Sequence, residues 1–391
     1  MTNEQESGRR IARLQQRLQQ AELDGALYLY PIDLFYLTAT RQTATLWVPA
    51  QGEPILFVRK SLQRAQQESG IEDIRPFPRS HEFAAQIAGK KIGMTFDVIP
   101  VQQYQYYQKI LPECQFSDIS AINRELRSLK TTAEIERMRY GGVQLSRVFA
   151  SMADFIRPGL REIDIAAEFE SRLRQLGGEG LVRMRAFNQE LFMGLTVAGP
   201  RGAAGGFFNG AATGTGLSAA APHGASRATV APDQPIMLDY TGIFDGYIVD
   251  MTRTFVAGRL RDDVHQAFQT AQDILHYLAA RLKPGANCGT LYAEALALAE
   301  EAGLADKFMG PAGEQAAFVG HGVGLELDEY PVLAQGFDVE IQAGQTLAVE
   351  PKFTFADQGI VGIENTYLVT PEGGEKITVL DDALIRVDAC S

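Results

Sequence analysis

Apolar and polar residues follow a helical pattern at the start of the chain and a strand pattern after it. Ile11, Leu14 and Leu18 recur at helical spacing, so we expect a helix over residues 8–22. Four short apolar runs come next, GALYLYP, TLWVPA, PILFVR and KIGMTF, and each predicts a buried strand, with a polar helix expected around residues 61–69. Strands separated by helices are typical of a small α/β domain. We expect this domain to end near residue 125.

The stretch ELRSLKTTAEIERMRYGG predicts a domain boundary at about residue 128. Thr131 or Thr132 can cap a helix there, because a threonine hydroxyl accepts a hydrogen bond from the first helical amides. Glu134 lies in the first turn of this helix, where negative charge is favoured. We therefore assign residues 1–127 to a small N-terminal domain and residues 128–391 to a second domain.

Helices and strands follow a repeated order in the second domain. Two helices are expected over about 132–155 and 162–176, and the Gly/Ala-rich passage RGAAGGFFNGAATGTGLSAAAPHG after them predicts a loop or lid. The strand-like runs PIMLDYTGIF and YIVDMTRTFVAG follow. Two more helices, over 262–282 and 289–302, precede the segments GHGVGLE, QTLAVEPKFTF and IVGIENTYLVT. Helices followed by a pair of acidic strands thus occur twice.

Length and charge narrow the class of protein. The chain has 391 residues, enough for two or three domains, and its net charge of −12 argues against a nucleic-acid partner. Its apolar runs are shorter than the roughly 18 residues that span a membrane, so no membrane partner is expected. The three cysteines, Cys114, Cys288 and Cys390, are far apart and form neither a disulfide framework nor a metal motif. Together with a charged N-terminus that shows no export signal, they predict a cytoplasmic protein.

Two aspartates belong to the first acidic strand pair. A two-residue turn at Asp245-Gly246 would place Asp250 opposite Thr241, with Asp239 two residues along on the same face. Such diagonal neighbours lie about 7–8 Å apart, so both carboxylates could reach one ion or a pair of ions.

Two glutamates belong to the second acidic strand pair. Glu350 and Glu364 are equally far from the turn cluster around Asp357, so we expect them to face each other across a hairpin. Pro351 has no amide hydrogen for a strand ladder, which predicts an edge or a bulge beside Glu350.

Four carboxylates in apolar strands are costly to bury unless they are protonated or neutralised by cations. Two divalent ions would neutralise all four. Oxygen ligands suit hard cations, and one imidazole shifts the preference towards Mn, Co, Fe or Zn. Of the five histidines, only His223 and His321 lie in glycine-flanked loops, where side chains commonly reach a site.

Each of these residues also has an ordinary structural interpretation. A single aspartate at the end of a strand is most often a turn residue or a solvated charge, and GHGVG could be a plain turn. The segment GTGLSA imitates a dinucleotide-binding motif, but it does not follow a clear strand within a βαβ unit. Four acidic residues on two hairpins, each hairpin preceded by a histidine in a loop, favour a single site that all six residues share.

These segments resemble a known family. LDYTGIFDGYIVDMTRTF, GHGVGLELDEYP, AVEPKF and GIENTYLVT are similar, in order and spacing, to the motifs of the M24 metallopeptidases, which include prolidase, aminopeptidase P and methionine aminopeptidase. The resemblance covers residues from about 128 to 375, and DLFYLTAT with LRSLKTTAEIERMR resembles the creatinase/prolidase N-terminal domain. It implies an α/β (α+β) fold: a small α/β N-terminal domain, followed by a pita-bread catalytic domain with pseudo-twofold α/β halves.

The resemblance also implies a chemistry. It implies a dinuclear centre of divalent Mn, Co, Zn or Fe, with manganese favoured, in which Asp250 and Glu364 bridge the ions. Water activated by the two ions would attack the amide bond before proline in short peptides, as in an Xaa-Pro dipeptidase or aminopeptidase. Glu350 would transfer the proton, His223 would bind the substrate or the intermediate, and a homodimer is implied. The metal ligands implied by the match are Asp239, Asp250, His321, Glu350 and Glu364.

Three positions depart from the family pattern. Asp328 stands where the family usually has a second histidine, Ala317 where prolidases and aminopeptidase P often have another, and Gly362 where many members have an arginine. The changes make the substrate pocket more anionic, which poorly suits the C-terminal carboxylate of a dipeptide. Our hypothesis is therefore a substrate with a positive group that Asp328 holds.

Two other functions stay open at this point. The same fold and metal site could hydrolyse a small non-peptide C–N bond, as creatinase-like and ectoine-hydrolase-like relatives do. A non-catalytic binding module is the other alternative, and degraded ligands would be its mark. All five implied ligands are present in this chain.

Overall fold

The computed structural model describes residues 2–185 and 190–388, and they form two compact units. Residues 2–127 and Arg185 make up the first unit, and residues 128–184 and 190–388 make up the second. Cys114 and Cys288 carry free thiols, and Cys390 lies outside the described residues.

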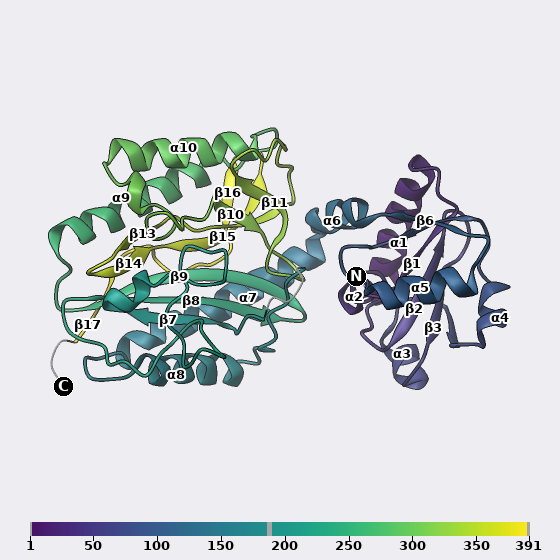
Figure 1. The fold of residues 1–391 in the computed structure, drawn as a ribbon, viewed down its shortest axis with the longest axis horizontal. Helices are drawn as coiled ribbons and strands as arrows, with labels where there is room; N and C mark the ends of the chain where they lie inside the picture. The colour runs from purple at the N-terminus through teal and green to yellow at the C-terminus, as the bar shows by residue number, and fades with distance from the viewer. Residues whose placement is uncertain (1, 186–189, 389–391) are drawn as a thin grey trace. The chain divides into compact units, whose positions relative to one another are not determined.

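The first unit is a six-stranded sheet flanked by helices (Figure 1). Its strand order is β4-β3-β2-β1-β5-β6, and β1 pairs antiparallel with β2 and parallel with β5. Leu27, Trp47, Phe57 and Phe83 form the centre of its core. The elements are α1 (Asn3–Gln20), β1 (Gly25–Tyr28), α2 (Pro31–Thr38), β2 (Ala44–Pro49), β3 (Ile55–Val58), α3 (Leu62–Glu68), β4 (Asp73–Pro76), α4 (Ser80–Ala84), β5 (Lys91–Met94), α5 (Val101–Ile110), β6 (Gln115–Asp118) and α6 (Ser120–Ser128).

Helix α1 begins five residues earlier than the apolar spacing predicts. Thr2 forms a capping box with Gln5: its hydroxyl accepts from the Gln5 amide, and the Gln5 side chain accepts from the Thr2 amide. This cap starts the helix before its first buried apolar residue, because it satisfies amides that have no partner within the helix.

The second unit is built on a nine-stranded sheet in which seven strands have the order β11-β10-β12-β15-β9-β8-β7. Strand β16 pairs with β15, and β17 pairs with β9. Strands β13 and β14 form a separate two-stranded sheet. The strands are β7 (Gly194–Ala198), β8 (Pro235–Phe244), β9 (Tyr247–Ala257), β10 (Phe318–Gly322), β11 (Glu329–Ala334), β12 (Thr346–Val349), β13 (Lys352–Phe355), β14 (Gly359–Gly362), β15 (Glu364–Thr370), β16 (Gly373–Lys376) and β17 (Ile385–Val387).

Two pairs of helices pack on this unit, one on each group of strands (Figure 1). Helices α7 and α8 contact β7 to β9, and helices α9 and α10 contact the strands from β10 to β14. The order of a helix pair followed by strands, which the sequence shows twice, is therefore the order of the fold. The helices and 3-10 turns are α7 (Thr132–Ser151), η1 (Met152–Asp154), α8 (Glu162–Gln175), η2 (Gly199–Ala203), α9 (Asp262–Ala279), α10 (Cys288–Glu301) and η3 (Ala305–Lys307).

The β8–β9 hairpin has the predicted register. Thr241 pairs with Asp250, and the turn residues Asp245 and Gly246 have φ angles of 50° and 81°. Two successive positive φ angles are what a tight hairpin turn requires, and Asp-Gly provides them with little strain.

The second acidic strand pair is interrupted at Pro351. Strand β12 ends at Val349, and β13 starts at Lys352, so the long strand expected from QTLAVEPKFTF is two short ones. Val349 pairs with Asn365 before the break, and Lys352 pairs with Gly362 after it. The register is the same on both sides, which places Glu350 and Glu364 opposite each other, as the sequence predicts.

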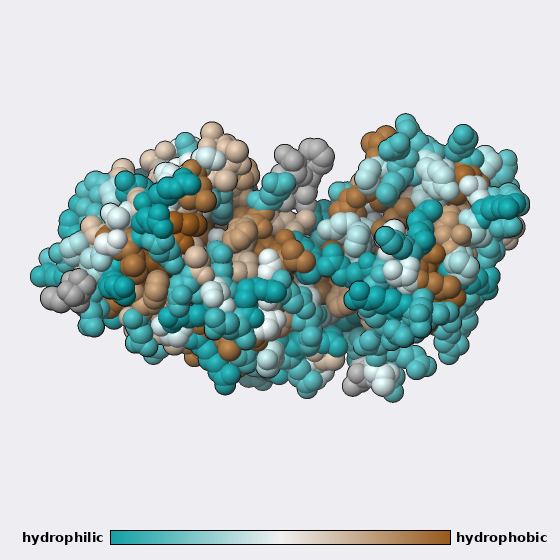
Figure 2. Space-filling model, turned by 90° about the horizontal axis from the view of Figure 1, so that it is seen from below, coloured by the Kyte–Doolittle hydropathy of each residue, from teal (hydrophilic) through white to brown (hydrophobic). Residues whose placement is uncertain are grey.

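Polar side chains cover most of the face seen in Figure 2, with hydrophobic ones in patches between them. Among the described residues, no helix is both long enough and apolar enough to cross a membrane.

Candidate metal centre

Five consecutive strands of the large sheet carry the acidic and imidazole groups of the site. Asp239 lies on β8, Asp250 on β9 and His321 on β10. Glu350 follows the last residue of β12, and Glu364 is the first residue of β15. Because β10, β12, β15, β9 and β8 are neighbours in that order, groups up to 125 residues apart in the chain meet in one place.

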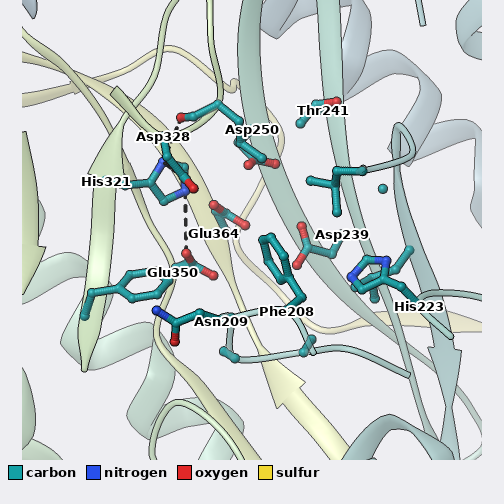
Figure 3. A pocket seen from close by; sticks show the side chains of 18 of the residues that line it. Phe208, Asn209, His223, Asp239, Thr241, Asp250, His321, Asp328, Glu350 and Glu364 are labelled. Atoms are coloured by element: carbon teal, nitrogen blue, oxygen red, sulfur yellow. Dashed lines mark hydrogen bonds and ion pairs between the residues drawn. The ribbon is translucent and has the colours of Figure 1, made fainter. Parts of the chain in front are cut away.

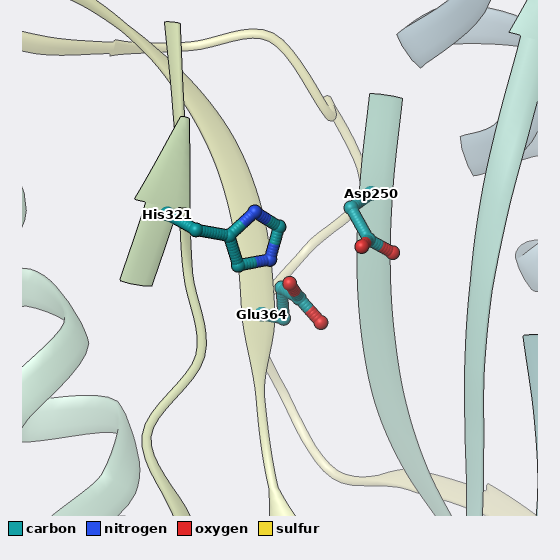
Figure 4. Close-up of side chains that lie close together, drawn as sticks. All are labelled: Asp250, His321 and Glu364. Carbon is teal, nitrogen blue, oxygen red and sulfur yellow. The ribbon is translucent and has the colours of Figure 1, made fainter. Parts of the chain in front are cut away.

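Asp250, His321 and Glu364 form the first set of potential ligands (Figure 4). One ligand atom from each lies within 4.8 Å of the others, and all three residues are buried. Two carboxylates and one imidazole suit Mn, Fe, Co or Zn better than they suit Ca.

Asp239, Glu350 and Glu364 form the second set, which shares Glu364 with the first. The two aspartates of the β8–β9 hairpin therefore belong to different sets. Lys352, the first residue of β13, extends its side chain into the second set. Its Nζ donates to Glu350 Oε2 at 2.5 Å, to Asp239 Oδ2 at 2.9 Å and to Glu364 Oε2 at 3.3 Å.

His321 is held in one orientation by its backbone surroundings. Its Nδ1 lies 3.0 Å from the carbonyl oxygen of Leu327 and 3.1 Å from that of Gly322. A hydrogen on Nδ1 satisfies these acceptors and leaves Nε2 as the atom that can bind a metal. Nε2 faces the site, 3.6 Å from Glu350 Oε1.

Burial strongly affects the acids of the first set. Burial, with the neighbouring charge of Asp239, raises the pKa of Asp250 to about 7. Burial, with the charge of Asp250, raises the pKa of Glu364 well above its usual range. Burial opposes the charge of Lys352, but Asp239 and its other two carboxylate partners raise the pKa of its ammonium group. The acids therefore need positive charge beside them to ionise fully.

A cavity of about 230 Å³ opens onto these residues (Figure 3). Asp239, Asp250, His321, Glu350 and Glu364 all line it, so the structure brings together the five residues that the sequence suggests as metal ligands. The larger apolar side chains of its wall are Leu191, Met193, Leu195, Phe208, Phe318, Leu327 and Val332.

His223 lines the same cavity on the side of Asp239 (Figure 3). It lies in the Gly/Ala-rich passage, where Gly224 donates to Thr213 and accepts from Gly216 through their backbones. Its ring packs edge-on against Phe208, and its Nε2 is buried without a hydrogen-bond partner among the described residues. Burial lowers its pKa, which favours the neutral ring, although Asp239 acts in the opposite direction.

The three departures from the family pattern occupy different surroundings. Asp328 lines the cavity, and its Oδ1 lies 3.5 Å from His321 Nδ1. Ala317 is exposed and does not line the cavity. Gly362 is buried opposite Lys352 in the β13–β14 ladder.

Lys352 and Thr252 are site residues that we did not identify from the sequence. Thr252 Oγ1 donates to Glu364 Oε2 at 2.7 Å. The spacing of Glu350 and Lys352 contained a signal, because residues two apart in an extended chain point to the same face. A lysine at that position in an otherwise apolar strand needs acidic partners.

The first set fits a divalent metal ion. Its donor types are those of a transition-metal site, and Glu364 Oε1 is buried without a hydrogen-bond partner in the part of the chain that the structure describes. A buried carboxylate oxygen without a partner costs free energy, and a bound cation would remove that cost.

Each of the two units matches the model of a known protein family. Residues 136–371 match the model of metallopeptidase family M24, and residues 10–129 match the creatinase/prolidase N-terminal domain. An Xaa-Pro dipeptidase of Lactobacillus helveticus is 25% identical over 391 residues, covering 96% of this chain and 98% of that protein.

Solved structures show the same fold. The prolidase of Pyrococcus horikoshii OT3 superposes with a TM-score of 0.81 at 21% identity, covering 96% of this chain and 100% of that one. An Xaa-Pro dipeptidase of Bacillus anthracis superposes with a TM-score of 0.83 at 24% identity, covering 97% and 100%. The expected α/β pita-bread architecture behind a creatinase-like domain is thus confirmed. M24 enzymes use divalent metals, and this chain, with its cluster of carboxylates and imidazole, belongs to the M24 metallopeptidase family.

Proposed function

We propose that the protein hydrolyses the amide bond before proline in short peptides. The observation that carries the proposal is the convergence of Asp250, His321 and Glu364 at a cavity that His223 and Glu350 also line. The similarity over nearly the whole chain to proteins named Xaa-Pro dipeptidase supports it.

Asp250, His321 and Glu364 would hold the metal, for which manganese is the favoured candidate. A bound divalent ion supplies Lewis acidity, which polarises a carbonyl group and lowers the pKa of a water molecule. The three side chains are fixed before substrate arrives, because each lies in or beside a strand of one sheet. Fixed ligands reduce the reorganisation that the reaction would otherwise require.

Glu350 is the proposed proton carrier. Its Oε2 accepts from Lys352, and its Oε1 is directed towards His321, so one oxygen is anchored and the other faces the site. A carboxylate so placed can take a proton from the attacking water and return it to the leaving nitrogen.

His223 is the proposed substrate-binding residue. Its unpartnered Nε2 can donate a hydrogen bond to the oxygen of the reacting carbonyl, where negative charge develops. The lowered pKa keeps the ring neutral, so it would act as a hydrogen-bond donor without carrying a full charge.

The cavity favours a small substrate. Its volume of about 230 Å³ is below the range of roughly 300–1,000 Å³ that is typical of sites for drug-sized ligands. None of the described residues that line it is a lysine or arginine, whereas Asp328 adds a further negative charge. This lining favours a substrate with a positive group over one that presents a free carboxylate.

The same lining favours a second candidate function, the hydrolysis of a small cationic amide that is not a peptide. That substrate would use the same metal ligands, and Asp328 would hold its positive group.

We also propose that residues 1–127 act as a separate N-terminal domain and residues 128–391 as the catalytic domain. The division into two compact units near Arg127 supports these bounds. The homodimer and the cytoplasmic location stay predictions from the sequence. Analytical sedimentation of the purified chain would test whether it is a dimer.

Mass-spectrometric detection of cleavage tests the function. The manganese-loaded protein is offered Xaa-Pro dipeptides, Xaa-Pro-Xaa tripeptides and a panel of small cationic amides, with the Asp250→Ala variant as the blank. Cleavage of the proline peptides by the wild type alone is expected, and the preferred length separates a dipeptidase from an aminopeptidase. Cleavage of cationic amides only would contradict the first proposal and support the second.

A further inference from the structure

Lys352 contacts the same three carboxylates that could hold a second metal ion. Asp239, Glu350 and Glu364 form the second potential ligand set, and each accepts a hydrogen bond from Lys352 Nζ, at distances between 2.5 and 3.3 Å. The lysine side chain is only 1% exposed, so its ammonium group cannot be solvated by bulk water in this position.

An ammonium group and a metal ion compete for this place. A divalent ion would bind each carboxylate oxygen at about 2.0–2.2 Å and would need the centre of the set. Lys352 Nζ already stands among the three oxygens. Two positive centres so close together would also repel each other strongly in a buried site.

The two oxygens of Glu364 have different surroundings. Oε2 accepts from Lys352 Nζ and from Thr252 Oγ1, whereas Oε1 is buried and has no hydrogen-bond partner within residues 2–185 and 190–388. Oε1 is therefore the atom left for a cation, and its set is completed by Asp250 and His321.

The backbone opposite Lys352 is adapted to its side chain. Gly362 pairs with Lys352 in the β13–β14 ladder, and a Cβ at position 362 would lie 2.5 Å from Lys352 Cγ. Because carbon atoms in van der Waals contact are about 3.5–4.0 Å apart, any larger residue would displace the lysine. The close approach of Lys352 thus explains why position 362 is a glycine, without any role in substrate recognition.

We propose that the Lys352 ammonium group is a permanent second cation of the site, so that the protein binds one divalent metal ion, through Asp250, His321 and Glu364. This inference rests on the proposed metal-dependent function. It replaces the second ion expected from the sequence with a residue of the chain.

The metal content of the chain tests the proposal. The full-length protein is freed of metal, saturated with Mn²⁺, passed through a desalting column and analysed for metal and protein. The comparison includes Lys352→Met, which removes the ammonium group and keeps an unbranched side chain, and Lys130→Met as the matched control. Lys130 is an equally buried lysine that pairs with Glu329 and contacts none of the four carboxylates.

One manganese per chain is expected in the wild type and in Lys130→Met, and two in Lys352→Met. Two ions, or none, in the wild type would overturn the proposal, and so would a single ion in folded Lys352→Met. Electron paramagnetic resonance of the wild type serves if Lys352→Met does not fold: an uncoupled Mn²⁺ signal is expected, whereas a coupled pair would overturn the proposal. Failure to cleave any Xaa-Pro peptide with one ion bound would reject the proposed function and leave this stoichiometry standing.

Discussion

Thr252 lies directly opposite Glu364 in the ladder between β9 and β15, and its hydroxyl donates a 2.7 Å hydrogen bond to Glu364 Oε2. Both residues are buried. The bond restrains the rotation of a carboxylate that belongs to both ligand sets, and it leaves Oε1 without a hydrogen-bond partner among the described residues. Thr252 therefore orients a ligand without being one.

Thr252→Val should weaken metal binding by about 10- to 100-fold, because losses of this size are typical when a hydrogen bond to a metal ligand is removed. Titration with a competing chelator measures the change. Thr252→Ser keeps the hydroxyl and should bind metal almost as the wild type does. Wild-type metal affinity in Thr252→Val would show that the hydrogen bond does not contribute to metal binding.

His223→Gln should lower kcat about 100- to 1,000-fold, as expected when one hydrogen-bond donor to a developing oxyanion is lost. Bound manganese should not change, because His223 belongs to neither ligand set. The measurement is steady-state kinetics with parallel metal analysis. A loss of metal in this variant would assign His223 to the ligands.

Asp328→Asn should raise KM for a substrate with a positive group and leave bound metal unchanged. The side chain lines the cavity and is 46% exposed, so a substrate can reach it. The orientation of His321 should persist, because the carbonyl groups of Leu327 and Gly322 still accept from its Nδ1. Loss of metal instead of a higher KM would contradict a role in substrate binding.

Gly362→Ala should destabilise the fold by about 1–3 kcal/mol, the usual cost of adding a carbon to a filled interior. The new Cβ would collide with the stem of Lys352. In a double-mutant cycle, Lys352→Gly should recover part of that loss, since it removes the nearest colliding atom, Lys352 Cγ, and leaves the backbone atoms of Pro351 and Lys352 in place. Urea unfolding of the four proteins supplies the coupling free energy, and additive effects would mean that the two residues do not interact.

Asp382→Asn should destabilise the protein at neutral pH and have little effect in acid. Burial opposes the charge of Asp382, yet hydrogen bonds from Lys376 and Asn365 and the charge of Arg253 lower its pKa below 3.8. A lowered folded-state pKa means that the ionised carboxylate stabilises the fold above the unfolded pKa of about 4 and loses this effect as the pH falls through the folded value. His276 also faces it, at 3.1 Å.

The expected cost at pH 7 is about 1.5–3 kcal/mol, typical of hydrogen bonds to a charged group. Urea unfolding at several pH values between 7 and 3 measures the difference in the free energy of unfolding between the wild type and the variant. A difference that stays constant over this range would mean that the carboxylate has the same pKa in the folded and unfolded chain.

Local patterns in the sequence were sufficient for much of the site. The Asp-Gly turn fixes the register of β8 and β9, so the relation between Asp250 and Thr241 could be predicted from the letters alone. Glu350 and Glu364 could be placed opposite each other for the same reason, because their hairpin is also local.

Non-local features could not be predicted in this way. Nothing in the local pattern requires β15 to lie between β12 and β9, and this order is what joins the two hairpins. The family resemblance, not the spacing, supplied that information. Lys352 was not identified from the sequence, because only Glu350 among its partners is its near neighbour in the chain, whereas Asp239 lies 113 residues earlier.

The central position of β15 also has a consequence for folding while the chain is being synthesised. This strand is made after both of its main neighbours, β9 and β12, and it carries the carboxylate that belongs to both ligand sets. Until residue 364 has left the ribosome, each neighbour exposes an unpaired edge, which is a known hazard for aggregation. A nascent chain shorter than this therefore holds neither ligand set complete and must wait for its last central strand before it can acquire metal.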